Sequence, residues 1–431
     1  AARFEPSGPL RGSLRPPPDK SVSHRAALIA AMAEGETTIE GYLDSADTRS
    51  TLAAVELLGA EVQGAGPRPI RPSLRIRGVG LRGPRSGIAI NVGNAGTLLR
   101  LLPGWLAGQE TGIWTLDGDD SIRRRPVDRV AEPLRQMGAQ LNCRDGRLPP
   151  LRIEGGPLHG ISYELPVASA QVKSCLLFAG LLAEGETRIV EPLPTRDHSE
   201  RMLAAAGAEI ERGDGAVAVR PAARLEPGAI AVPADFSSAA FFLVAALLVP
   251  GSDISLVGVG LNPTRTGLLS ILARMGAEME VDTESERGGE PSGRVRARAS
   301  ALRGAEVGGA EIPLAIDELP LVALAACFAE GTTTIRDAAE LRRKESDRIA
   351  TVAAALTALG AEVETSEDGM RIEGGGGLRG GAIDSHGDHR IAMLGAVAGL
   401  ASREGVTAHG MDAAAVSYPG FERDLGSLRR P

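Results

Sequence analysis

A sixfold internal repeat constrains the fold of this chain more than any other feature of its sequence. Segments 33–39, 183–189 and 329–335 share a phrase of small residues and glycine followed by a β-branched run, and weaker copies surround three further glycines. The six glycines, Gly35, Gly108, Gly185, Gly251, Gly331 and Gly405, lie 73, 77, 66, 80 and 74 residues apart. This regular spacing predicts six units of similar length.

A second phrase, Gly-Ala and usually Glu, alternates with the first. Its glycines are Gly59, Gly138, Gly207, Gly276 and Gly360. The residues before them, such as 51–58 and 349–359, are rich in Ala and Leu, which predicts helices that end at a left-handed glycine before a strand begins. Each unit then approaches a β-α-β-α-β-β pattern. Units of about 70 residues are too long for a solenoid and favour two α/β lobes of three units each.

Two proline-rich segments, 15–19 and 231–235, are the expected crossings between the lobes. They predict one discontinuous lobe of residues 1–18 and 235–431 and a second lobe of residues 19–234. Because ligands favour interdomain clefts, we expect the active site there. Segment 285–292, rich in Gly, Glu and Ser, is expected to be a mobile turn without function.

Charge and composition exclude several classes of function. The net charge of −8 argues against nucleic acid or an anionic membrane as a partner. We expect a cytoplasmic enzyme, because the sequence shows neither a run of about 18 apolar residues nor a signal peptide. The odd, dispersed cysteines Cys143, Cys175 and Cys327 argue against a disulfide framework or a zinc site.

Lysine is rare in this chain: of 47 basic residues only Lys20, Lys173 and Lys344 are lysines. The planar guanidinium group of arginine stays protonated, whereas lysine has a compact ammonium group that can lose its proton. The lysines therefore predict a site for small phosphorylated anions, with chance survival as the alternative.

The first two lysines and a glycine loop each precede an apolar stretch. Lys20, Ser21 and Arg25 could converge at a helix start that Ser21 caps, a geometry that suits phosphate. In loop 91–100 we expect the amides of Gly96 and Thr97 to be free to bind an anion. We also expect at least one of the arginines at 123–125 to point into the cleft. The alternatives are a capped surface helix and a glycine turn that binds nothing.

Around Lys173, the expected contacts come from Ser169 and Gln171, while Lys173 itself serves either a phosphate or the interior. Segment 195–201 begins another polar helix, which a solvated helix end would explain equally well. Around Lys344, a carboxylate beside an ammonium and an arginine one turn later can transfer protons and clamp anions. Asp317-Glu318 and Asp388-His389-Arg390 add to this cluster, for which a charged surface is the alternative.

Together these segments resemble the 5-enolpyruvylshikimate-3-phosphate synthases nearly from end to end. The family's motifs appear at 93–97, 344–348 and 388–390 in its order and spacing. Variants at 169–173, 196–200 and 262–265 are similar to the family's second class, some of whose members tolerate glyphosate. The resemblance implies the two-lobed enolpyruvyl transferase fold with three β-α-β-α-β-β units per lobe and an active site in the interdomain cleft.

The resemblance also implies a reaction. The enolpyruvyl group of phosphoenolpyruvate passes to the 5-hydroxyl of shikimate 3-phosphate, by addition and then elimination of phosphate through a tetrahedral intermediate, in chorismate and aromatic amino acid biosynthesis. It implies no metal and no organic cofactor. We expect a monomer in which glyphosate competes with phosphoenolpyruvate.

Residue roles follow from the family's motifs. Shikimate 3-phosphate would be held by Lys20, Ser21, Arg25, Ser169, Ala170, Gln171, Arg196, Asp317 and Lys344. Phosphoenolpyruvate would be held by Lys20, Asn94, Gly96, Arg125, Gln171, Glu345, Arg348, His389 and Arg390. Asp317 is the expected base for the 5-hydroxyl with Lys344 beside it, Glu345 would protonate the methylene carbon, and Lys20 would touch both substrates. Two phosphates and two carboxylates at one site require many cations.

The chain departs from the family's pattern at two positions, and two other functions are alternatives. Val416 stands where many members carry a lysine that contacts phosphoenolpyruvate, and Pro18 where the second class usually has Gly. The sister enzyme that acts on UDP-N-acetylglucosamine usually carries a reactive cysteine before the Arg-Pro step, and 118–125 has none. A non-catalytic repeat scaffold would leave the three lysines unexplained.

Overall fold

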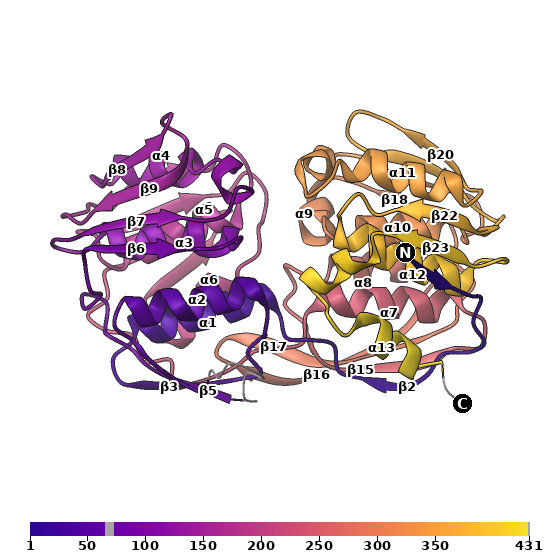
Figure 1. Cartoon of the computed structure of the whole chain (residues 1–431), viewed down its shortest axis with the longest axis horizontal. Helices are drawn as coiled ribbons and strands as arrows, with labels where there is room; N and C mark the ends of the chain where they lie inside the picture. Colours follow the sequence, from indigo (N-terminus) through magenta and orange to yellow (C-terminus); the bar gives the residue numbers. More distant parts are fainter. Residues whose placement is uncertain (65–72, 430–431) are drawn as a thin grey trace. The chain divides into compact units, whose positions relative to one another are not determined.

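The computed structural model describes residues 1–64 and 73–429. The chain forms two compact units. The first comprises residues 1–17, 234–285 and 291–431, and the second comprises residues 18–233 and 286–290. Figure 1 labels many of the helices and strands of both units.

The second unit contains three four-stranded sheets of matching topology. In sheet order they are β14 (Ala229–Ala231), β3 (Glu36–Glu40), β5 (Ser73–Arg77), β4 (Glu61–Gln63); β6 (Ile88–Asn91), β7 (Ile113–Asp117), β9 (Leu148–Glu154), β8 (Gln140–Arg144); and β10 (Ser162–Glu164), β11 (Thr187–Val190), β13 (Ala216–Val219), β12 (Ile210–Gly213). The first two strands of each sheet are parallel, and the remaining pairs are antiparallel. Its helices are α1 (Lys20–Met32), α2 (Ala46–Leu57), α3 (Gly96–Ala107), η1 (Ile122–Arg124), α4 (Asp128–Gln136), α5 (Ala170–Gly180) and α6 (His198–Ala205).

The first unit also contains three sheets. They are β16 (Glu278–Arg287), β17 (Glu290–Arg298), β15 (Asp253–Gly260), β2 (Arg11–Leu14); β18 (Glu306–Val307), β19 (Thr332–Ile335), β21 (Met370–Glu373), β20 (Glu362–Thr365); and β1 (Ala2–Phe4), β23 (Val406–His409), β22 (Gly381–Asp384). Its helices are α7 (Phe236–Leu248), α8 (Gly267–Arg274), η2 (Gly309–Glu311), α9 (Ile312–Ala315), α10 (Leu319–Ala326), η3 (Ala339–Arg343), α11 (Arg348–Ala358), α12 (His389–Ala401), η4 (Met411–Val416) and α13 (Phe421–Ser427).

Each sheet with its helices is one copy of the repeat. In chain order the clearest copy runs β6, α3, β7, α4, β8, β9, which is the predicted β-α-β-α-β-β pattern. Two copies take their parallel edge strand from a distant part of the chain, since β14 pairs with β3 and β2 pairs with β15. The glycines of the second phrase adopt positive φ angles, between 91° at Gly207 and 110° at Gly59, directly after their helices. The predicted helix ends and the predicted fold class are confirmed.

Three helices lie in the core of each unit: α1, α3 and α5 in the second unit, and α7, α10 and α12 in the first. Every residue of α7 is buried, which fits its lack of a polar face. A glycine lets two of these helices approach closely, because a Cβ on Gly104 of α3 would lie 2.0 Å from the carbonyl oxygen of Cys175 in α5. Close packing of this kind fixes where the helix starts lie relative to one another within a unit.

Segment 285–292 contains a turn, as predicted, but one of its residues is buried. It forms the ends of β16 and β17 and the turn between them, where Gly288 and Gly289 take φ angles of +65° and +83°. Glu290 is buried, and its Oε1 lies 2.8 Å from Nδ1 of His198 at the start of α6. Composition could not show this contact, because His198 lies 92 positions away from Glu290 in the sequence.

Within residues 1–64 and 73–429, no helix is long and apolar enough to cross a membrane.

Candidate active site

The sequence-predicted site residues gather at the N-termini of the core helices. Lys20 is the first residue of α1, Gly96 of α3 and His389 of α12, while Gln171 is the second of α5. The amides of a first helical turn lack intrahelical partners and carry partial positive charge, so they favour anions. The core helix starts are therefore suited to phosphates and carboxylates.

At the start of α1, the cap is Asp19 rather than the predicted Ser21. The Asp19 Oδ1 accepts a hydrogen bond from the Val22 amide at 2.9 Å. Ser21 lies inside the first turn, and its carbonyl oxygen accepts from Arg25 Nη1 at 3.0 Å. The Lys20 ammonium lies 3.1 Å from Oδ2 of Asp47 on α2 and its side chain is 36% exposed, so it remains accessible to a ligand.

Arg25 of α1 is buried and forms hydrogen bonds with residues of α5 and α6. Its Nε donates to Ser199 Oγ of α6 at 2.8 Å, and its Nη2 donates to Ser174 Oγ of α5 at 3.0 Å. Burial lowers the pKa of Arg25 to about 10, and the nearby positive charge of Arg196 acts in the same direction. The guanidinium therefore stays charged at neutral pH while it holds the starts of α1, α5 and α6.

Lys173 lies in the interior of the unit and pairs with carboxylates there, which is one of the two roles that the sequence left open. Its side chain is 1% exposed, and its Nζ lies 2.6 Å from Glu200 Oε1 and 3.0 Å from Glu191 Oε2. Burial raises the pKa of the Glu200 carboxyl, although Lys173 opposes this shift. His198, Ser199 and Glu200 are buried, so segment 195–201 is not a solvated helix end.

The glycine loop positions an arginine. The Gly96 amide donates to the Asn94 carbonyl oxygen at 2.9 Å, so the expectation that this amide is free is wrong. The Asn94 side chain accepts from Arg125 Nη2 at 2.9 Å and donates to Asp119 at 2.7 Å. A Cβ on Gly96 would lie 3.1 Å from Arg125 Nη1, which shows how closely the guanidinium covers this helix start.

Gln171 is held by Arg100, which the sequence reasoning did not single out. Arg100 Nη1 donates to Gln171 Oε1 at 2.8 Å, and Gln171 Nε2 donates to Thr97 Oγ1 at 3.3 Å. Burial, with the charge of Arg125, lowers the pKa of Arg100 to about 10. The available signal was its spacing, because a residue four positions after Gly96 lies on the same helix face.

The remaining predicted residues of this unit lie at the starts of α5 and α6. Ser169 caps α5 by accepting from the Val172 amide at 3.4 Å. Ala170 is the first residue of α5, and its carbonyl oxygen accepts from Ser174 Oγ at 2.6 Å. Arg196 precedes Asp197, the N-cap residue of α6.

In the first unit, four cations surround the carboxylate of Asp317. Oδ1 lies 3.3 Å from Arg348 Nη1 and 3.6 Å from Lys344 Nζ. Oδ2 lies 3.8 Å from Arg390 Nη2 and 3.9 Å from Arg265 Nη1. The structure thus brings together Asp317, Lys344, Arg348 and Arg390 as the sequence predicted, and adds Arg265.

Arg348 links three carboxylates. Its side chain is 1% exposed; Nε donates to Asp388 Oδ2 at 2.8 Å and Nη2 to Glu345 Oε2 at 2.6 Å. Asp388 is the N-cap of α12 and accepts from the Arg390 amide at 2.9 Å. Arg348 therefore connects the starts of α11 and α12 with Asp317.

The protonation states around Glu345 follow from its neighbours. Burial favours the neutral form of Glu345, but the charges of Arg348 and Arg390 outweigh it, so the pKa is lowered and the group is a carboxylate. Burial, together with the charge of Arg390, lowers the pKa of His389 to about 4. His389 is therefore neutral at physiological pH.

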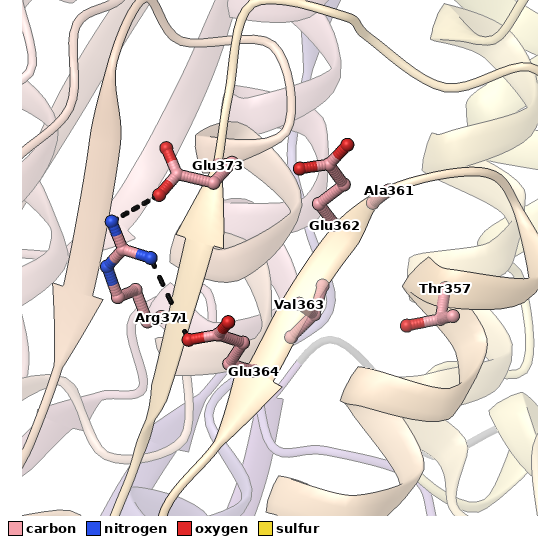
Figure 2. A pocket seen from close by; sticks show the side chains of 7 residues that line it. All are labelled: Thr357, Ala361, Glu362, Val363, Glu364, Arg371 and Glu373. Atoms are coloured by element: carbon pink, nitrogen blue, oxygen red, sulfur yellow. Dashed lines mark ion pairs between the residues drawn. The ribbon is translucent and has the colours of Figure 1, made fainter.

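Two further features of the first unit are the position of Val416 and a hollow beside α11. Val416, at the end of η4, is 59% exposed. A hollow of about 400 Å³ is lined by Thr357 of α11 and by residues of and next to β20 and β21. Figure 2 labels the side chains that line it. Its Arg371 pairs with Glu364 and Glu373, and none of the sequence-predicted site residues lines it. Among the described residues, no group of three or more His, Cys, Asp or Glu side chains could hold a metal ion.

Comparison with known proteins agrees with this arrangement. The family described as EPSP synthase (3-phosphoshikimate 1-carboxyvinyltransferase) matches residues 4–425. The chain belongs to the EPSP synthase family. The family motifs at Gly96, Lys344 and Arg390 are the ones that the structure places at or beside helix starts.

Relatives within the EPSP synthase family resemble the chain over nearly its whole length. A 3-phosphoshikimate 1-carboxyvinyltransferase of Synechococcus sp. (strain JA-3-3Ab) is 52% identical over 99% of this chain and 96% of its own length. The enzyme of that name from Alkalilimnicola ehrlichii is 50% identical over 96% of this chain and 93% of its own length. A solved EPSP synthase structure from Acinetobacter baumannii has a TM-score of 0.91 at 42% identity and covers 99% of this chain and 97% of its own. The two-lobed fold of the family is therefore this chain's fold.

Proposed function

We propose that this protein transfers the enolpyruvyl group of phosphoenolpyruvate to the 5-hydroxyl of shikimate 3-phosphate, with release of phosphate. The observation that carries the proposal is the Asp317 cluster, a carboxylate with Lys344, Arg348 and Arg390 within 3.8 Å. A base surrounded by cations can take a proton from a hydroxyl while the cations hold anionic groups beside it. The names of the relatives supply the two substrates.

The addition step assigns roles to two carboxylates. Asp317 accepts the proton of the 5-hydroxyl as its oxygen bonds to C2 of phosphoenolpyruvate, and Lys344, 3.6 Å away, stabilises the developing charge. Glu345 delivers a proton to C3, which becomes a methyl group. In the elimination step, the methyl group returns a proton to Glu345, and the C2–O bond to phosphate breaks with its electron pair leaving on phosphate. The proton held by Asp317 leaves with the phosphate, so both carboxyl groups return to their starting states.

Substrate binding provides a way for Glu345 to become an acid. In the free protein Glu345 is ionised because Arg348 Nη2 holds it at 2.6 Å. The carboxylate of phosphoenolpyruvate would compete for the same guanidinium. When Arg348 turns its contacts to the substrate, Glu345 loses its nearest cation and its pKa rises toward that of a proton donor.

We propose that both groups of helix starts act on the two substrates together, with the residue roles that the family motifs imply. Shikimate 3-phosphate contacts Lys20, Ser21, Arg25, Ser169, Ala170, Gln171, Arg196, Asp317 and Lys344. Phosphoenolpyruvate contacts Lys20, Asn94, Gly96, Arg125, Gln171, Glu345, Arg348, His389 and Arg390. The charges of these arginines and lysines and their places at the N-termini of the core helices support this assignment.

A single assay tests the reaction. The purified protein is given phosphoenolpyruvate with shikimate 3-phosphate in one reaction and with UDP-N-acetylglucosamine in another, and phosphate release is followed. We expect release only with shikimate 3-phosphate. Release only with the nucleotide sugar, or with neither acceptor, would refute the proposal.

Finer properties belong to the same proposal. The motifs at 169–173, 196–200 and 262–265 support membership of the second class. Glyphosate would compete with phosphoenolpyruvate beside Gly96, where the absent side chain lets Arg125 and Arg100 come close to the helix start. We further propose that the enzyme acts as a monomer in the cytoplasm on its water-soluble substrates.

A further inference from the structure

Arg265 contacts the proposed base from the side of the protein interior. It follows segment 262–264 and precedes α8, and its side chain is 6% exposed. We propose that Arg265 is a positioning residue that holds the Asp317 carboxylate in place and favours its ionised form until it accepts the proton of the 5-hydroxyl. This inference rests on the proposed function, because it gives Arg265 a part in the same proton transfer.

The guanidinium of Arg265 is anchored on the side away from Asp317. Its Nη2 donates to Ser237 Oγ at 2.7 Å and to Asp235 Oδ1 at 3.2 Å. Asp235 is itself fixed as the N-cap of α7, where it accepts from the amides of Ser237 and Ser238. Arg265 is therefore bound to the start of a fully buried helix.

The backbone of Arg265 is fixed as well. Its amide donates to the Asn262 carbonyl oxygen at 2.9 Å. The Asn262 Oδ1 accepts from the Thr264 amide at 2.9 Å and from Thr264 Oγ1 at 2.7 Å. Segment 262–265 is a tight turn that fixes the position of Arg265.

The four cations around Asp317 differ in what else they bind, because the family motifs assign Lys344, Arg348 and Arg390 to the substrates but not Arg265. Oδ1 faces Lys344, whose side chain is 23% exposed and which the family motif assigns to substrate. Oδ2 faces Arg265 at 3.9 Å, and Arg265 is tied to Asp235 and Ser237. When substrate anions draw Lys344 and Arg348 toward themselves, Arg265 remains beside Asp317. A constant cation at this distance favours the carboxylate form that a base requires.

A second contact supports the orientation of the same segment. Ser237 Oγ, which accepts from Arg265, donates its own proton to Glu318 Oε1. Arg265 Nη1 also lies 3.9 Å from that oxygen. Glu318 is fully buried and directly follows Asp317 in the chain. The chain Asp235, Arg265, Ser237, Glu318 thus fixes the backbone that carries the base.

The rival role is purely structural, in which Arg265 only neutralises the buried acids Asp235 and Glu318. The two roles differ in what they predict for pH dependence. The titratable or charged groups around Asp317 and its cations are Asp235, Arg265, Glu318, Lys344, Glu345, Arg348, Asp388, His389 and Arg390. Removing Arg265 alone takes one positive charge from Asp317 and leaves the other cations in place.

The test compares three full-length variants by phosphate release from phosphoenolpyruvate and shikimate 3-phosphate. Arg265→Gln should lower kcat by about 10- to 100-fold, the cost of a misplaced catalytic group, with the KM of both substrates nearly unchanged. It should also move the acid limb of kcat/KM to higher pH by about one unit. Arg265→Lys should keep the acid limb of the wild type, because it keeps the charge, and restore part of kcat. Arg274→Gln, at the exposed end of α8, is the matched control and should behave as wild type.

A variant that keeps every charge covers the case in which Arg265→Gln fails to fold. Ser237→Ala removes the hydroxyl that joins Arg265 to Glu318 and should lower kcat by about 10-fold, because the base is less well placed, with the acid limb unmoved. An Arg265→Gln enzyme that folds and keeps the wild-type kcat and acid limb would overturn the inference. So would an unchanged kcat in Ser237→Ala. If the wild type itself releases no phosphate, the proposed function fails instead.

Discussion

The buried ion cluster around Lys173 allows a prediction whose size follows from the structure. Lys173→Met keeps the length of the side chain but removes the ammonium that lies 2.6 Å from Glu200 and 3.0 Å from Glu191. Removing one partner of a buried pair costs about 3–5 kcal/mol, because the remaining charge stays buried. In a unit of this size, 1 kcal/mol corresponds to about 2–4 °C, so the thermal midpoint should fall by about 6–20 °C.

The loss should depend on pH. Burial already raises the pKa of Glu200 above its unfolded value, and loss of Lys173 raises it further. A carboxyl with a raised folded-state pKa binds its proton more tightly in the folded state. Its stabilising contribution is therefore complete below the unfolded pKa and is lost as the pH rises through the folded pKa. Lys173→Met should be more damaging at pH 8 than at pH 5.

Circular dichroism during heating at the two pH values measures both effects. The control is Lys20→Met, because Lys20 makes its ion pair with Asp47 near the surface and such pairs contribute at most about 1 kcal/mol. A fall of less than about 3 °C at pH 8, roughly the effect of 1 kcal/mol, would show that the cluster does not stabilise the unit. An equal fall at both pH values would refute the part assigned to Glu200.

Three further predictions concern catalysis. Lys20→Arg and Lys344→Arg should abolish phosphate release at saturating substrates, whereas Lys173→Arg should only weaken it; equal losses in all three would contradict the separation of roles. Gly96→Ala should weaken glyphosate inhibition more than it raises the KM of phosphoenolpyruvate, because the new Cβ would lie 3.1 Å from Arg125 Nη1; inhibition constants measured for both enzymes decide this, and unchanged inhibition would refute it. Glu345→Gln should slow the entry of deuterium from D₂O into the methylene group of the product by about 100-fold or more. Mass spectrometry measures this rate, and a variant that incorporates deuterium as fast as the wild type would show that Glu345 is not the proton donor.

The sequence predicted the fold because each repeat unit carries its own short pattern of a helix, a glycine that ends it and a following strand. Glycines such as Gly59 and Gly138 end their helices with φ angles of 110° and 102°, as the alternating phrases indicated. The Asp317 cluster was predictable for a related reason, since Lys344, Glu345 and Arg348 lie within one turn and a half of chain. Short-range patterns of this kind determine helix ends and the chemistry that they carry.

The errors and omissions have two causes: a choice between two neighbouring capping residues, and contacts between residues that lie far apart in the sequence. Ser21 and Asp19 can both cap a helix, and only the folded chain shows that Asp19 does so. Arg265 belonged to a motif noted only for its resemblance, and its contacts with Asp235 and Asp317 span 30 and 52 positions. The burial of Glu290 against His198 was likewise invisible in composition. Sequence patterns show which groups are available, and packing decides which of them meet.

A comparison of two helix starts shows how a repeated fold acquires a specialised site. Asp19 caps α1 and Asp235 caps α7 with nearly the same backbone, φ −66° in both and ψ 124° and 120°. The residue after the cap is Lys20 in one copy, exposed and charged, and Phe236 in the other, buried in the core. The repeat supplies the same anion-favouring helix end in each copy. One substitution after the cap then decides whether that end faces a ligand or supports the interior, as Asp235 does by anchoring Arg265.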